Sequence, residues 1–111
     1  MTTNQLLTYR AIVTDSNLEP ITLDVRRGGA PVDLTIFTGT ITIRDERSAA
    51  LIAENLPVAL NANGRAEYYF TAEQVALITK DSVWLVEWKI VAPDGKAHRL
   101  YKARLPVRVK L

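Results

Sequence analysis

The most hydrophobic alternating segment of the chain is Val83-Trp84-Leu85-Val86-Glu87-Trp88-Lys89-Ile90. From Trp84 to Ile90 every second side chain is large and apolar, whereas the charged side chains of Glu87 and Lys89 lie between them. Successive side chains of a β-strand point to opposite faces of a sheet, so this spacing predicts a strand with one buried face. We expect it to be a central strand of the protein.

The same period of two recurs in further segments, which turn-forming residues separate. Pro93-Asp94-Gly95 follows the central strand and favours a tight reversal, because proline presets φ and glycine tolerates positive φ. Gly28-Gly29 and Asn61–Gly64 have the composition of two more turns. The alternating segments are residues 21–25, 40–44, 65–70 and 105–111. Together with weaker segments they predict an all-β fold, an antiparallel β-sandwich of about seven or eight strands.

Three segments depart from this pattern. Thr71-Ala72-Glu73-Gln74 has the form of a capping box, which predicts one short helix from about Ala72 to Ile78 across one end of the sheets. Residues 49–60 fit either a helical turn or a strand, and we interpret them as an edge strand. The stretch Leu6–Val13 is a candidate for a further strand. We therefore divide the chain into an N-terminal arm or extra strand at residues 1–17 and a sandwich at residues 18–111.

The composition is that of one ordinary globular domain. The chain has 111 residues, of which 48% are hydrophobic and 23% charged, so a second core is not expected. It has no cysteine, which excludes a disulfide scaffold, Cys-ligated zinc and a thiol nucleophile. Its wholly apolar runs are a few residues long, whereas a membrane-spanning helix needs about 20 residues. Residues 1–5 lack the basic and apolar start of a signal peptide, so we expect neither membrane insertion nor export by that route.

Residues suited to catalysis are few. His98 is the single histidine and follows a turn, where a surface or interface position is the simpler interpretation. No serine lies in a Gly-x-Ser-x-Gly setting. Asp15-Ser16-Asn17 with Glu19 suggests calcium, but the twelve-residue loop with its central glycine is missing. We predict a protein that is not an enzyme and binds no cofactor or metal.

Basic residues gather at the C-terminal end, although the formal net charge is only +2. They are Lys96, Arg99, Lys102, Arg104, Arg108 and Lys110. From residue 104 on they alternate with aliphatic residues, which predicts one aliphatic and one cationic strand face. The cationic face suits solvent, an acidic protein partner or the phosphates of nucleic acid. Nucleic acid is the least favoured of the three, because Tyr101 is the one aromatic residue available there for base stacking.

Several motifs resemble those of a known family when they are taken in order. Ala30-Pro31-Val32-Asp33-Leu34-Thr35 is similar to the G-x-P-V-D-L-T-G turn of small immunoglobulin-like domains in tailed-phage virions. These domains include the N-terminal domain of the baseplate upper protein and tail-fibre attachment domains. Further likenesses are Asn63–Tyr68 to the G-x-x-x-Y strand, Phe70–Gln74 to the L-T-x-E-Q helical turn, and Val86–Ile90 with Pro93–Lys96 to the final hairpin. The chain differs where Ile36-Phe37-Thr38 precede Gly39 and where Lys80–Trp84 replaces a P-G-x-Y sequence.

The resemblance covers about residues 20–110 and implies an immunoglobulin-like sandwich. It implies a non-enzymatic structural subunit of the virion, in the tail, baseplate or neck, assembled in the host cytoplasm and present in many symmetric copies. Its partners would be other virion proteins, bound in part by strand addition at sheet edges with the Leu6–Val13 arm as a candidate donor. The candidate interface residues are Leu6, Leu7, Tyr9, Ile12, Arg99, Arg104, Arg108 and Lys110.

Two alternatives remain open at this point. One is a capsid cement or decoration protein, which would hold shell subunits together rather than attach to the tail. The other is a binding module for carbohydrate or nucleic acid, suggested by Tyr68, Tyr69 and the basic strand.

Overall fold

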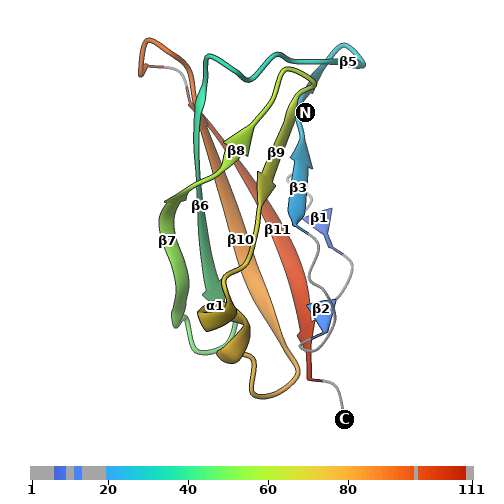
Figure 1. The fold of residues 1–111 in the computed structure, drawn as a ribbon, viewed down its shortest axis with the longest axis vertical. Coiled ribbons are helices and arrows are strands. Elements are labelled where there is room, and N and C mark those ends of the chain that lie inside the picture. Colours follow the sequence, from blue (N-terminus) through green and yellow to red (C-terminus); the bar gives the residue numbers. More distant parts are fainter. Residues whose placement is uncertain (1–6, 10–11, 14–19, 97, 110–111) are drawn as a thin grey trace.

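Two facing layers of β-sheet make up the computed structural model, which describes residues 7–9, 12–13, 20–96 and 98–109 (Figure 1). The larger sheet has the strand order β1-β11-β10-β6-β7, and β2 also pairs with β11. Its strands are β1 (Leu7–Thr8), β2 (Ile12–Val13), β6 (Thr38–Asp45), β7 (Leu51–Pro57), β10 (Ser82–Val91) and β11 (His98–Arg108). The smaller sheet, of order β3-β9-β8, consists of β3 (Ile21–Asp24), β8 (Ala59–Leu60) and β9 (Arg65–Tyr68). A separate hairpin joins β4 (Arg26–Arg27) to β5 (Ala30–Pro31).

The core lies between the two sheets, and β10, in the middle of the larger sheet, contributes one face to it. Trp84, Val86, Trp88 and Ile90 are all buried, while the intervening side chains are partly or fully exposed. On β11 the same alternation buries Ala103, Leu105 and Val107 against them. The predicted central strand and the predicted all-β sandwich with one short helix are therefore confirmed.

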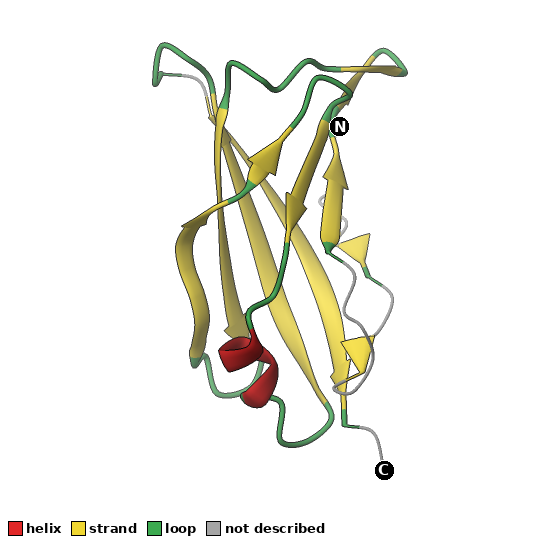
Figure 2. Ribbon diagram, viewed as in Figure 1, coloured by secondary structure: helices red, strands yellow, loops and turns green. Residues whose placement is uncertain are grey.

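The short helix α1 (Ala72–Ala76) lies at one end of the sandwich (Figure 2). The predicted capping box is present: the Thr71 hydroxyl accepts from the Gln74 backbone N–H, and the Gln74 side chain accepts from the Thr71 N–H. The helix ends two residues before the predicted Ile78, which is buried beyond its C-terminus. Gln74 is also buried, and its side chain lies 2.6–2.9 Å from the Tyr68 hydroxyl of β9. This pair ties the helix to the smaller sheet.

The predicted edge strand is β7 rather than a helical turn, but residues 59–60 form a separate strand, β8, at the edge of the smaller sheet. β7 is the last strand of the larger sheet, and its pairing with β6 is interrupted by register shifts. Asn55 has a φ of 47°, and its backbone N–H donates to the Thr42 hydroxyl on β6. Such an irregular edge, ending in Pro57, is a poor template for adding another strand.

The described part of the N-terminal arm runs parallel to β11. Leu7 pairs with Ala103 in β1, and Ile12 pairs with Val107 in β2, with a register shift of one residue between the two pairs. The predicted single strand is therefore two short strands. They occupy the edge of β11, which would otherwise be the second free edge of the larger sheet.

Candidate functional site

A cleft of about 440 Å³ opens between the sheets at the end of the sandwich opposite α1. Its size lies within the range of roughly 300–1,000 Å³ that is usual for ligand pockets. Three segments border it: the chain from β3 into the β4–β5 hairpin, the loop after β5, and the tip of the β10–β11 hairpin. We call it the cationic cleft, because Arg26, Arg27, Lys96 and Arg99 line it.

The floor of the cationic cleft is apolar. Its side chains are those of Val25, Val32, Leu34, Phe37, Ile90 and Tyr101. Ile90 and Tyr101 belong to the core-facing rows of β10 and β11, because Tyr101 pairs with the buried Trp88. The floor is thus a continuation of the core that neither sheet covers.

The loop after β5 supplies the rest of the floor and is held by local hydrogen bonds. The Asp33 carboxylate accepts from both the backbone N–H and the hydroxyl of Thr35, at 2.9 and 2.6 Å. The hydroxyl bond, followed by the backbone bond, lowers the pKa of Asp33. This turn lets Leu34 point inward, where it is 1% exposed, and the Phe37 N–H closes the loop by donating to the Leu34 carbonyl. The Asp-Leu-Thr sequence is therefore a structural turn.

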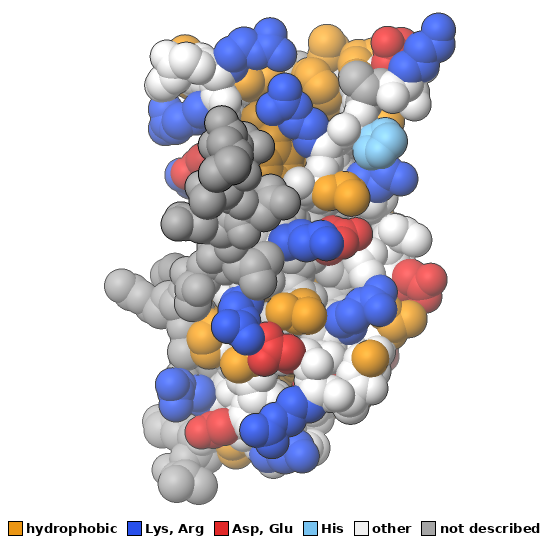
Figure 3. All heavy atoms as spheres, turned by 180° about the vertical axis from the view of Figure 1, so that it is seen from behind, with side chains coloured by type: hydrophobic (Ala, Val, Ile, Leu, Met, Phe, Trp, Pro, Cys, Tyr) orange, Lys and Arg blue, Asp and Glu red, His pale blue; other side chains and the backbone are white. Residues whose placement is uncertain are grey.

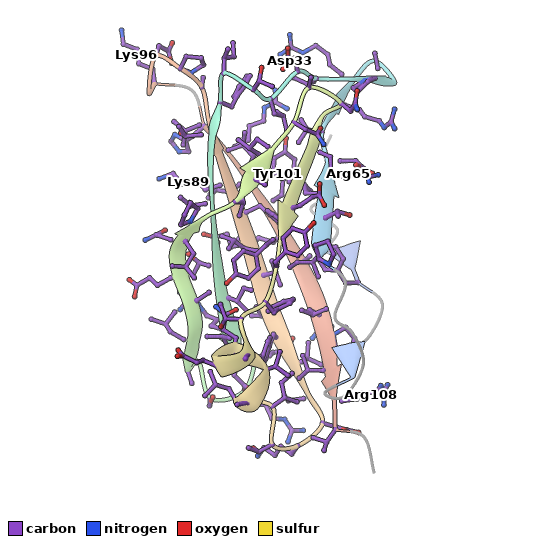
Figure 4. The ribbon with its side chains drawn as sticks, viewed as in Figure 1. Asp33, Arg65, Lys89, Lys96, Tyr101 and Arg108 are labelled. Atoms are coloured by element: carbon purple, nitrogen blue, oxygen red, sulfur yellow. The ribbon has the colours of Figure 1, made fainter. Side chains whose placement is uncertain are left out.

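The rim of the cleft is cationic. Arg26, Arg27, Lys96 and Arg99 line it together with His98, and all five side chains are exposed. Arg99 pairs with Ile90 across the strands, so it occupies a core-facing position where the layers part. Figure 4 shows Lys96 at the tip of the β10–β11 hairpin. Among the described residues that line the cleft, none is aspartate or glutamate.

Ion pairs do not neutralise this rim within the described part of the chain. The three pairs found there are Arg65–Asp24, Arg104–Glu46 and Arg108–Asp81, and all of them lie outside the cleft.

Figure 3 shows the outer face of the larger sheet, and in its upper part hydrophobic side chains (orange) appear between groups of Lys and Arg side chains (blue). A concave apolar surface surrounded by cations suits a ligand that is both apolar and anionic.

Arg104 and Arg108 lie on the outer face of β11, away from the cleft. The predicted alternation is confirmed, since both are exposed while Leu105 and Val107 are buried. Arg104 Nε donates to the Glu46 carboxylate at 2.9 Å, and an Arg108 guanidinium nitrogen lies 3.8 Å from Asp81. The outer face is thus partly balanced by acidic neighbours. Arg99 therefore does not share a face with Arg104 and Arg108, the two other arginines among the candidate interface residues.

Tyr9 is tied into the domain rather than directed away from it. Its hydroxyl donates to the Thr22 carbonyl on β3 at 2.7 Å and accepts from the Trp88 indole N–H at 2.9 Å. Burial raises the pKa of Tyr9 to about 12, partly offset by the Trp88 hydrogen bond. Of the other predicted interface residues, Leu6 and Lys110 lie outside the described residues. Leu7 and Ile12 are placed by their backbone pairing in β1 and β2.

The tyrosines suggested for ligand binding differ in exposure. Tyr68 is buried and bonded to Gln74, so it is a core residue, whereas Tyr69 is 61% exposed. Within the described residues no group of three His, Asp or Glu side chains is close enough to hold a metal ion. None of the helices in that part of the chain is long and apolar enough to cross a membrane.

Sequence reasoning missed Arg26, Arg27 and Phe37 as members of a site. A signal was present, because two adjacent arginines end an alternating strand directly before Gly28-Gly29. The sequence alone gave no reason to place this turn beside the tip of the hairpin that carries Lys96, about seventy residues further along the chain.

No protein-family model matches the chain, and no curated protein matches it. Any assignment of function therefore rests on the residues and geometry described above and on the sequence resemblance.

Proposed function

We propose that this protein is a non-enzymatic structural subunit of a tailed-phage virion, an immunoglobulin-like adaptor in the tail, baseplate or neck that binds other virion proteins. The observation that carries the proposal is that the motifs behind the resemblance contact one another. Gly64 of the G-x-x-x-Y motif has a φ of +77°, and a side chain there would meet the Val25 carbonyl at 2.5 Å and the Val32 backbone at 3.0 Å. Val32 belongs to the Pro-Val-Asp-Leu-Thr turn.

The second contact joins the other end of the strand motif to the helical turn. Tyr68 closes the G-x-x-x-Y motif, and its hydroxyl is hydrogen-bonded to Gln74 of the Thr-x-x-Gln motif. Four residues of the likeness, Val32, Gly64, Tyr68 and Gln74, therefore take part in two contacts, each of which joins two of the motifs. Individually weak motifs gain support when they form a single structural unit.

The strand order also supports the immunoglobulin-like part of the proposal. The larger sheet has β11-β10-β6-β7, which corresponds to the order G-F-C-C′ of immunoglobulin-type sandwiches. The smaller sheet has β3-β9-β8, which corresponds to B-E-D. In this correspondence the β4–β5 hairpin lies in the connection between strands B and C.

Partners would bind chiefly through loops, ends and faces rather than through free strand edges. The edge strands are irregular or short, since the pairing of β7 has register shifts, β3 has four residues and β8 has two, while β1 and β2 already occupy the edge of β11. The arm nevertheless remains a candidate donor strand, because within the described residues each of its two pairings with β11 is two residues long. Exchange of such an arm between neighbouring copies is a low-cost route to assembly.

The test is to find the protein in particles. Phage particles from cells that carry the gene would be purified on a density gradient and analysed by mass spectrometry, then labelled with a gold-coupled antibody against this chain. We expect the chain in the particle fraction, with gold at the tail, baseplate or neck. Absence of the chain from purified particles would overturn the virion assignment. Gold confined to the shell would replace the adaptor by the capsid cement protein, the main alternative.

A further inference from the structure

We propose that the cationic cleft binds an acidic peptide segment of a partner protein, which inserts one large apolar side chain between the sheets and places carboxylates against the rim. The inference concerns binding chemistry and does not depend on the virion assignment. It rests on the cavity, its apolar floor and the charges around its mouth.

The apolar floor of the cleft is the reason for proposing that the bound peptide inserts an apolar side chain. Ile90 and Leu34 are nearly fully buried by their own neighbours, and beside them Phe37, Val32 and Tyr101 are partly covered. A large side chain placed against these groups would remove apolar surface from water on both partners, which is the usual anchor of a peptide contact.

The cations of the rim are the reason for proposing acidic residues on both sides of the apolar side chain in the bound peptide. Arg26 and Arg27 lie on β4, whereas Lys96 and Arg99 belong to the β10–β11 hairpin, so the cations come from two separate segments bordering one opening. Arginine forms bidentate hydrogen bonds with carboxylates, and such charge-assisted bonds are among the stronger ones at interfaces. Arg26 already donates to the Gly29 carbonyl at 3.2 Å, which holds its guanidinium near the turn.

Nucleic acid fits the same charges less well. A phosphate backbone needs cations in a row along an open groove, with aromatic side chains on which bases can stack. Here the cations surround a recess, and the aromatic groups, Phe37 and Tyr101, are partly buried among aliphatic neighbours. The shape of the cleft therefore favours a peptide that inserts one side chain over a nucleic acid whose phosphate backbone follows a groove.

Calorimetric titration of the full chain with unlabelled, end-blocked nonapeptides would test the proposal. The probe peptide has a central phenylalanine with four glutamates on each side, and two control peptides replace the phenylalanine by alanine or the glutamates by glutamine. The protein variant Arg26→Gln/Arg99→Gln is compared with Arg47→Gln/Lys89→Gln, in which two exposed cations outside the cleft are removed. Both variants change the net charge equally, and circular dichroism shows that each is folded.

The expected result is binding of the probe by the native protein and a loss of about tenfold or more in Arg26→Gln/Arg99→Gln. Arg47→Gln/Lys89→Gln should lose less than about threefold, because distant exposed charges are screened. The alanine and glutamine peptides should each bind about tenfold more weakly or worse.

Four outcomes would overturn the proposal. They are no binding of the probe, equal losses in both double variants, an alanine peptide as good as the probe, and tighter binding of a nine-nucleotide single strand that the cleft variant abolishes. The last would assign the cleft to nucleic acid. None of them bears on whether the chain is present in virions, so a failure here and a failure of the proposed function are distinguishable.

Discussion

Replacing Tyr9 by phenylalanine removes one oxygen atom at the point where the arm, β3 and β10 meet. That oxygen accepts the indole N–H of Trp88, which is 0% exposed, and donates to the carbonyl of Thr22. Leaving a buried N–H without an acceptor costs about 1–3 kcal/mol, and the lost bond to the carbonyl about 1 kcal/mol more. We therefore expect the free energy of unfolding to fall by about 2–4 kcal/mol.

The assay is urea unfolding followed by tryptophan fluorescence. A urea m value of about 2 kcal/mol/M, the middle of the usual range, converts the loss into a midpoint lower by about 1–2 M, with the m value unchanged. Tyr69→Phe is the matched control, because that hydroxyl is on an exposed side chain with one long 3.4 Å bond to Glu67, and it should change stability by less than about 0.5 kcal/mol. The indole N–H resonance of Trp88 should also shift in Tyr9→Phe. Equal stability of the two variants would mean that the Tyr9 hydroxyl is not the acceptor of the Trp88 indole N–H.

Alkaline pH gives a second measurement on Tyr9. Its pKa in the folded protein, about 12, lies above the ordinary value of 10.0, because burial disfavours the phenolate. The raised pKa of Tyr9 therefore contributes to the free energy of unfolding. This contribution is fully present below pH 10 and is lost as the pH rises toward 12. Stability measured across that interval should fall less steeply in Tyr9→Phe than in the native protein. Parallel pH curves would show that Tyr9 titrates as an exposed tyrosine.

Three further predictions concern the supporting contacts, and the same urea assay measures each. Gly64→Ala should lower the free energy of unfolding by more than about 2 kcal/mol, because positive φ and the Val25 carbonyl at 2.5 Å both oppose a side chain. Gly28→Ala, at positive φ but in open space, should lower it by only about 1 kcal/mol. Equal costs would exclude the close approach. Gln74→Leu should cost about 1–3 kcal/mol by depriving Tyr68 of its partner, and an unchanged midpoint would argue against that bond. Arg104→Gln should cost at most about 1 kcal/mol, since its pair with Glu46 is half exposed; a larger loss would mean that this pair is structurally essential.

The strands were predictable because their cause is local. Alternation in residues 83–90 follows from the geometry of a single strand, and the capping box at Thr71 and Gln74 involves residues three apart. The turns at Gly64 and Gly95 were visible for the same reason, since both need positive φ. Such features depend on neighbours in sequence, so one sequence suffices to find them.

The candidate site was harder to predict because it depends on contacts distant in sequence. Arg99 was recognised as part of a basic stretch, but its position on the core-facing side of β11 follows from its pairing with Ile90. Nothing local to Arg26 shows that it faces the same cleft. The apolar arm around Tyr9 predicts an interface position for that residue, whereas its hydrogen bond to Trp88 joins residues 79 positions apart. The interface assignment of the arm stays a prediction.

A cryo-electron microscopy map of the particle would show whether this sandwich is an adaptor that joins virion proteins. We expect symmetric copies of the sandwich at the tail, baseplate or neck, in contact with at least one other virion protein. We also expect density from an acidic segment of such a neighbour between Arg26 and Arg99. A map that holds no density for the sandwich at any of these positions would contradict the adaptor assignment.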